Sequence, residues 1–439
     1  MSWKHALMQE QYVHRVLFNM AQHGWDVDAH KVQRLMQHCA NRIASLDSEI
    51  MPLIPNRVIP DGVPILKPFK KDGTPSQACI KRLEEDISYL WGPFCCVKFE
   101  PVNLGSDKQL KEYLFSVGWE PDEWNYNKKT KETTSAKLTE SSLESLAGVD
   151  AKGIKERIQA SHRLSQLEGW LSGVRPDGRL PMIISGITPT YRAKHRVIVN
   201  VPGGDAYLGK EMRSCFVAKP GYKMIGIDSK SNQLRMLCHY MKDDSYTAAV
   251  VHGRQEDKTD IHSVNQKIAG LPTRAKAKPF IYGLLFGAQD AKLGKIVGGG
   301  EKDGARLRAT FMRGLPAYAR MIKQIEGFWA NKKYLLGLDG RLLRPRAKHM
   351  LLVYLLQGAE AIYMKVTLAF IQRRGEREDI DFQLVGFIHD ELQYMVKDED
   401  TDRFSALALK AFKDAGEYLK LSVPMEGDLK VGLTWGDTH

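Results

Sequence analysis

The stretch VGFIHDELQYMV (385–396) places two adjacent carboxylates between apolar arms. The arms are rich in β-branched and aromatic residues, which predict a hairpin with Asp390 and Glu391 at its turn, directly after His389. An aspartate can occupy such a turn simply because its side chain caps the local backbone. The chemical alternative is one half of a metal site, since hard divalent cations bind carboxylate oxygens. That alternative requires a second carboxylate at the end of another apolar strand.

The stretch YKMIGIDSKSNQLRMLCHYM (222–241) supplies such a carboxylate. Its apolar strand ends at Asp228, Ser229 follows, and the apolar spacing beyond predicts a helix. Asp228 alone could be a helix cap. Asp228 and Asp390 together, each ending an apolar strand, predict a paired-metal site. Two Mg²⁺ ions about 3.5–4 Å apart can bind the attacking and leaving oxygens of a phosphoryl transfer.

The stretch PTRAKAKPFIYGLLFG (272–287) predicts a helix that binds a triphosphate. Arg274, Lys278 and Tyr282 are four residues apart and therefore share one helical face. Arginine is a forked donor to phosphate oxygens, and lysine is a compact charge. Tyr282 and Phe286 add an aromatic floor for a sugar or base, which a merely solvated basic helix would not need.

The excess positive charge lies in one segment of the chain. The whole chain carries +12, from 64 Lys and Arg against 52 Asp and Glu. Residues 254–348 hold 20 Lys and Arg against 8 Asp and Glu, which equals the entire excess. Such a segment is typical of proteins that bind nucleic acid or polyphosphate, although a solvated face has the same composition. His262 lies in this segment and is a further candidate phosphate contact, with a structural role as the alternative.

Length and composition indicate an intracellular protein of several subdomains. The chain has 439 residues, of which 43% are hydrophobic, so it can bury a substantial core. It has no run of 18 apolar residues, and its first residues lack an apolar signal core, so no membrane association is expected. Its six cysteines form no CxxC pair, which argues against a zinc site and favours reduced thiols.

The predicted elements place the two carboxylates in one sheet. Helical patterns precede and follow an extended, Pro- and Lys-rich segment at 51–98, which is predicted to be an insertion without a packed helix. Strands are expected within 181–227, helices dominate from about 245 to 333, and strands return at 383–396. A single sheet interrupted by a helical excursion would produce this order.

These stretches resemble motifs A, B and C of family A DNA polymerases, and in particular the replicative polymerases of short-tailed bacteriophages. Motif A corresponds to 228–235, motif B to 274–283 and motif C to 389–391, in the same order. The likeness extends over nearly the whole chain, and further resembling segments are NLGSDKQLKEYLFSVGW (103–119), TYRAKH (190–195), VNVPG (199–203), LDGRLLRPR (338–346) and LLQGAEAIYMK (355–365).

The resemblance implies an α+β fold shaped like a right hand, with an antiparallel palm sheet and helical fingers and thumb. The expected divisions are an N-terminal helical entry to the palm at 1–40, a thumb at 41–175 with its insertion at 51–98, palm at 176–250, fingers at 251–349 and palm at 350–439. It also implies template-directed DNA synthesis with release of pyrophosphate, in the cytoplasm of a bacterial host, by a monomer that binds primer–template DNA and dNTPs.

The resemblance also implies a role for each matching residue. Asp228 and Asp390 hold two Mg²⁺ ions, with Mn²⁺ as a substitute, and the Ser229 carbonyl faces a metal. Glu391 is an auxiliary carboxylate near the primer end, and Lys278 is the proton donor to pyrophosphate. The remaining assignments are triphosphate binding by His262, Arg274 and Lys278, sugar and template-base contacts by Tyr282 and Phe286, and DNA contacts by Arg192, Gln357 and His389.

The sequence departs from the family pattern in three places. The motif A glutamate that blocks a ribose 2′-hydroxyl is Gln233, which keeps the bulk but loses the charge, so weaker discrimination against ribonucleotides is predicted. Val353 replaces an asparagine near Gln357, which removes one check on mispairs. No exonuclease domain is expected upstream, so this chain is not expected to proofread. Two alternatives stay open: the sequence is a truncated piece, or a separate protein supplies the exonuclease.

Two further expectations come from the same resemblance. A tyrosine at the position of Tyr282 accepts sugars that lack a 3′-hydroxyl, which predicts efficient incorporation of dideoxynucleotides. The insertion at 51–98 lies where the phage enzymes bind a processivity factor, and a loop over DNA is the simpler alternative.

Three other functions compete with DNA synthesis as explanations of this sequence. A single-subunit phage RNA polymerase shares the palm and a motif B tyrosine, but Glu391 ends motif C as in the DNA enzymes. A metal-dependent nuclease would not need the helix that carries Arg274 and Lys278. A non-catalytic nucleic-acid clamp explains the positive charge but leaves Asp228 and Asp390 unexplained.

Overall fold

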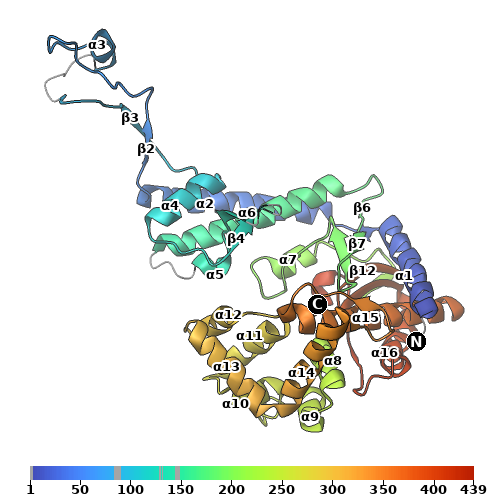
Figure 1. Ribbon diagram of the computed structural model, residues 1–439. Coiled ribbons are helices and arrows are strands. Elements are labelled where there is room, and N and C mark those ends of the chain that lie inside the picture. Colours follow the sequence, from blue (N-terminus) through green and yellow to red (C-terminus); the bar gives the residue numbers. More distant parts are fainter. Residues whose placement is uncertain (1–2, 84–89, 128–129, 131, 144–148) are drawn as a thin grey trace. The chain divides into compact units, whose positions relative to one another are not determined.

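The computed structural model describes residues 3–83, 90–127, 130, 132–143 and 149–439. The chain divides into two compact units (Figure 1). One consists of Met1–Gln33 with Glu168–His439, and the other of Arg34–Leu167. The first unit contains the predicted chemical residues.

A four-stranded antiparallel sheet is the centre of the first unit. Its strand order is β12 (Phe382–Ile388), β13 (Glu391–Lys397), β9 (Tyr222–Ser229) and β14 (Gly427–Gly432). The two middle strands are largely buried, and β13 also carries the buried polar residues Glu391 and Gln393. The predicted α+β class, the antiparallel sheet and the helical excursion between its strands are confirmed.

Helices α1 (Trp3–His23) and α16 (Thr401–Tyr418) pack with this sheet, and the long helix α15 (Leu351–Arg377) packs against both of them. The segment Lys348–Arg377 is long and apolar enough to cross a membrane, but 89% of its most apolar window is buried inside the protein, as in a core helix. The Glu10 carboxylate on α1 accepts hydrogen bonds of 2.8 Å from Lys365 on α15. Arg341 also donates to Glu10 and pairs with Asp339.

The segment between β9 and β12 is mostly helical. It contains α8 (Asn232–Met241), α9 (Asp244–His252), α10 (Ile261–Ala269), α11 (Arg274–Leu285), α12 (Asp290–Lys295), α13 (Glu301–Gly314) and α14 (Pro316–Lys332). Phe280, Phe311 and Tyr318 form edge-to-face aromatic pairs in its core. Asp260 caps the start of α10, and Gly270 ends it in the left-handed conformation.

Short strands complete the first unit. They are β1 (Trp25–Asp26) with β6 (Arg179–Leu180), β7 (Ile183–Ile187) with β8 (Ala193–Arg196), and β10 (Leu335–Leu336) with β11 (Leu342–Leu343), together with helix α7 (Gly209–Arg213). Trp25, Phe216 and Trp435 pack their rings together within about 5.4 Å, which joins the N-terminal segment to the C-terminal one.

The second unit has its own core. It contains most of α2 (Ala29–Ile50) and α6 (Val149–Gly173), with α3 (Gln77–Leu83), α4 (Asp107–Ser116), α5 (Glu140–Leu143), the pair β2 (Arg57–Pro60) and β3 (Val97–Glu100), and the pair β4 (Trp124–Tyr126) and β5 (Thr133–Ala136). Leu46, Leu110, Trp119 and Ile154 belong to its hydrophobic cluster. The assignment of this region as a thumb stays a prediction.

The insertion at 51–98 is more structured than predicted. Helix α3 forms within it, because seven consecutive residues follow the capping Ser76 without proline or glycine. Residues 84–89 of the insertion lie outside the described part of the chain. Several large side chains here are exposed, among them Leu66, Trp91 and Phe99. Partner binding at this insertion stays a prediction.

Candidate active site

The sheet register aligns three carboxylates across neighbouring strands. Asp228 on β9 lies opposite Glu391 on β13 and opposite Asp428 on β14. The backbone N–H of Ser229 donates to the carbonyl of Asp390 at 3.0 Å, which fixes the end of the hairpin against β9. Residues paired in this way lie about 5 Å apart between Cα atoms. The two strand-end aspartates predicted from sequence are therefore brought to one place.

The turn between β12 and β13 consists of His389 and Asp390. His389 has φ = +57°, a left-handed conformation that is uncommon for a residue with a side chain. Its ring lies edge-on to that of His195, with centroids 5.4 Å apart, and His195 Nε2 is 2.6 Å from the Phe387 carbonyl. Desolvation, together with Arg192 and His195, lowers the pKa of His389 to about 4, so this side chain is neutral at pH 7.

The electrostatics of the aspartate pair suit a divalent cation. Desolvation and the nearby charges of Asp390 and Glu391 raise the pKa of Asp228 to about 7. Desolvation also raises the pKa of Asp390. Carboxylates that repel one another in this way are stabilised when a cation binds between them. In the described part of the chain no group of three or more Asp, Glu, His or Cys is arranged to hold a metal, so the fit rests on the aspartate pair.

Glu391 is held by the C-terminal segment. Its carboxylate accepts from Trp435 Nε1 at 2.6 Å and from Gln393 Nε2 at 2.7 Å, and it lies 3.2 Å from His439 Nδ1. Desolvation raises the pKa of Glu391, but His439, Gln393 and Arg213 outweigh it and keep the pKa below its usual value. Glu391 is thus a buried, charged anchor beside the aspartates.

The candidate triphosphate residues lie on α10 and α11. Arg274, at the start of α11, donates from Nη2 to Asp260 at 2.8 Å and from Nε at 3.1 Å. Asp260 also caps α10 through the backbone N–H of His262 at 3.0 Å. Arg274 is therefore fixed to the cap of the neighbouring helix, while Lys278 is exposed one turn further along.

An aromatic face continues from these residues. The rings of His262 and Tyr282 have centroids 6.5 Å apart, and Tyr282 stacks with Phe286 at 6.2 Å. Desolvation and the charges of Asp390 and Asp228 raise the pKa of Tyr282. Tyr282 is therefore close enough to the carboxylates to be affected by their charge, and Phe286 is 46% exposed.

A further cluster of polar side chains lies around α15 and contains Glu360, a residue that was not predicted from the sequence. Glu360 is fully buried, accepts a hydrogen bond from Gln233 at 3.0 Å and pairs with Arg192 at 2.5 Å. Thr190, two residues before Arg192, donates to Gln357 at 3.2 Å. Gln233, Arg192 and Gln357, predicted separately, are thus linked around one helix.

Sequence reasoning missed Asp260, Glu360 and Asp428. A signal was available for two of them. Asp260 precedes a helical pattern, as helix caps do. Glu360 is a lone carboxylate within the apolar stretch LLQGAEAIYM. Asp428 gave no signal, because its place beside Asp228 depends on strand pairing.

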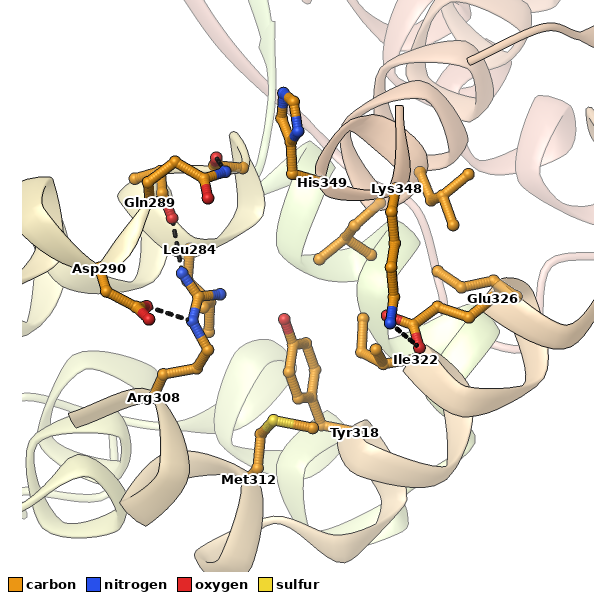
Figure 2. Close-up of a pocket in the computed structure, with 15 residues that line it drawn as sticks. Leu284, Gln289, Asp290, Arg308, Met312, Tyr318, Ile322, Glu326, Lys348 and His349 are labelled. Carbon is orange, nitrogen blue, oxygen red and sulfur yellow. Dashed lines mark hydrogen bonds and ion pairs between the residues drawn. The ribbon is translucent and has the colours of Figure 1, made fainter. Parts of the chain in front are cut away.

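A separate cavity of about 430 Å³ lies in the helical region and contains none of the predicted site residues. Figure 2 shows that Arg308 with Asp290 and Lys348 with Glu326 occupy opposite walls. Each of these charged side chains is paired with an opposite charge across a salt bridge, and Tyr318 lies between the two pairs (Figure 2).

Comparisons with known proteins place this arrangement among polymerases. The family model described as DNA polymerase family A matches residues 74–437. A DNA-directed DNA polymerase of Escherichia phage Phieco32 is 27% identical, with 98% of each chain covered. The DNA-directed DNA polymerase of Escherichia phage T7 is 29% identical over 79% of this chain and 54% of its own.

Among solved structures, the fold resembles the POL domain of Pol1 from M. smegmatis in complex with DNA primer-template and dNTP. The TM-score is 0.77 at 19% identity, and the match covers 98% of this chain and 70% of the other. The likeness supports the right-hand fold predicted from sequence.

Proposed function

Because the chain belongs to DNA polymerase family A, we propose that it extends a primer 3′-hydroxyl with dNTPs in the order directed by a template, releasing pyrophosphate. The observation that carries this proposal is the sheet register that brings Asp228 and Asp390 together beside the helix face of Arg274 and Tyr282. An RNA polymerase, relaxed sugar selection and a non-catalytic clamp are not favoured, since the phage relatives are DNA-directed DNA polymerases.

Family A polymerases use divalent metal ions, and we propose that Mg²⁺ binds here. Asp228 and Asp390 would hold the ions, with the Ser229 carbonyl as a further ligand. When bound, the ions would favour loss of the primer hydroxyl proton and neutralise charge on the reacting phosphate. The proposal is supported by the raised pKa of Asp228, which reflects its burial and the repulsion of the neighbouring carboxylates that a cation would relieve.

The helix residues would bind the triphosphate. Arg274 has Nε and Nη2 committed to Asp260, so Nη1 is the part of its guanidinium that a phosphate oxygen would contact. Lys278 is exposed on the same face and would donate a proton to the leaving pyrophosphate. Burial and Arg274 lower the pKa of His262, which suits a neutral donor to a phosphate oxygen.

The remaining residues would position the base pairs. Tyr282 would pack by the incoming sugar and Phe286 by the template base. Arg192 and Gln357 would contact the minor-groove side of the terminal pairs, and His389 would lie near the primer end. Glu391 would act indirectly, because its buried carboxylate is bound by the C-terminal segment and fixes the strand that follows Asp390.

Primer extension on a labelled primed template with Mg²⁺ tests this function. The wild-type chain should extend with dNTPs and not with rNTPs. Asp390→Asn should reduce extension by about a hundred- to a thousandfold, as loss of a central electrostatic group does in other enzymes, while DNA binding in a gel-shift assay remains. Asp398→Asn, in the exposed loop after β13, is the matched control. Undiminished extension by Asp390→Asn would refute the assignment.

A further inference from the structure

Glu360 is a carboxylate without solvent access at the centre of the candidate site. It lies on α15, with 0% of its surface exposed. Gln233 Nε2 donates to its Oε2 at 3.0 Å, and Arg192 Nη2 lies 2.5 Å from its Oε1. Its two oxygens therefore connect a residue of α8 with a residue of the loop before β8.

The helix itself gives no reason for a carboxylate at this position. The neighbours Gly358, Ala359, Ala361 and Ile362 are buried, and an apolar side chain would pack there without a desolvation penalty. Desolvation, opposed by Arg192 and reinforced by Asp390, raises the pKa of Glu360 to about 7. The fold thus retains an unfavourably placed acid, and its contacts are the two residues assigned to the sugar and to the terminal base pair.

We propose that Glu360 is the positioning residue for sugar selection, supplying from α15 the carboxyl group that Gln233 lacks. This inference rests on the proposed function. Because the Gln233 amide binds Glu360 through its nitrogen, its carbonyl oxygen is the end left to face an incoming sugar. Gln233 and Glu360 then act as one gate, and the weaker discrimination predicted from Gln233 alone is replaced by discrimination that depends on Glu360.

The same carboxylate holds Arg192, which is assigned to the minor-groove side of the terminal pair. Loss of this carboxylate would weaken its contacts with both Gln233 and Arg192. Sugar selection and the extension of mispaired primers should therefore change together when Glu360 changes. If the role of Glu360 were merely structural, its loss would reduce overall activity. The preference for dCTP over rCTP and the preference for matched over mispaired primers would then stay unchanged.

A charge-swap cycle tests this gate in the full-length chain. Gln233→Glu places two carboxylates at hydrogen-bond distance, so kcat/KM for dCTP should fall by about tenfold or more. Adding Glu360→Gln restores one acid and one amide: the new amide donates to Glu at 233 and accepts from Arg192. The doubly substituted chain should recover to within about threefold of wild type. Glu360→Gln alone should lower the ratio of kcat/KM for dCTP over rCTP by about tenfold.

The control is Glu376→Gln, which removes an exposed carboxylate from the same helix. It should change neither the preference for dCTP over rCTP nor the preference for matched over mispaired primers.

Thermal unfolding measures the contact between positions 233 and 360 independently of activity. It compares the wild type, the two single substitutions Gln233→Glu and Glu360→Gln, and the doubly substituted chain. Gln233→Glu should lower the unfolding midpoint, and the double substitution should restore it.

Two outcomes would overturn the inference. If the effects of the two substitutions are additive in an active enzyme, and the doubly substituted chain does not recover, the role proposed for Glu360 is refuted. The proposed polymerase function would then still stand. A wild-type chain that fails to extend primers would refute the proposed function and sugar selection with it, while unfolding would still report whether the two side chains are coupled.

Discussion

Asp260→Asn should weaken both the helical region and its hold on a triphosphate. Asp260 caps α10 and binds Arg274 through two hydrogen bonds. Desolvation raises the pKa of Asp260, but Arg274 and Ser263 outweigh it and lower the pKa to about 2 from an ordinary value of 3.8. Asparagine still caps a helix, so the substitution chiefly removes the charge that orients the guanidinium of Arg274.

The size of the effect follows from the pKa. The lowering corresponds to about 2.4 kcal/mol. The Arg274 side chain is 37% exposed, so solvent screening reduces this to about 1–2 kcal/mol of unfolding free energy at pH 7. Because the folded-state pKa is below the unfolded one, this stability is present above about pH 4 and is lost as pH falls towards 2. The difference between wild type and Asp260→Asn should shrink over that range.

Urea unfolding and single-nucleotide insertion kinetics measure the two effects. KM for dNTP should rise by about fivefold, the factor that about 1 kcal/mol gives, because Arg274 is no longer preorganised. Asp290→Asn is the matched control: it breaks a 2.6 Å pair with Arg308 in the same helical region, on the cavity wall in Figure 2. It should leave KM unchanged. A lower KM in Asp260→Asn would refute the reasoning, since Asp260 would then compete with the triphosphate.

Three further predictions concern other parts of the molecule. Relative to Asp228→Asn, the free energy of unfolding of the metal-free wild type should fall as pH rises from about 4 to about 7, because folded Asp228 binds its proton more tightly than the unfolded chain does. Mg²⁺ should raise the thermal midpoint of the wild type more at pH 8 than at pH 5, and an equal rise at both values would contradict this. Glu10→Gln should cost about 3 kcal/mol in urea unfolding, because Lys365 and Arg341 lose a buried partner, and a loss below 1 kcal/mol would count against it. Tyr282→Phe should raise the preference for dNTP over dideoxynucleotide in competition assays by about tenfold or more, as loss of a hydroxyl that fills a polar site does; an unchanged preference would exclude that role for the tyrosine hydroxyl.

Much of the fold could be predicted from the local spacing of apolar and charged residues in the sequence. Apolar runs that end in an acid predicted the strands before Asp228 and Asp390, and fourfold spacing predicted the helix face of Arg274. The insertion at 51–98 was predicted less well, because the described residues of α3, Gln77–Leu83, make only about two helical turns and show little periodicity. Individual residue roles and subdomain limits stay predictions, because they depend on contacts with DNA and nucleotide that no local sequence pattern encodes.

The sequence by itself determined most of the candidate residues for chemistry and which face of an element each occupies. This is local information, set by the periods of 2 and 3.6 residues. The tertiary structure alone decided which faces meet. Gln233 and Glu360 are 127 residues apart in the chain, and Asp428 joins Asp228 only through strand pairing. Such contacts arise from packing between distant elements, which no local spacing encodes, and they convert a plausible list of residues into a site with a particular charge.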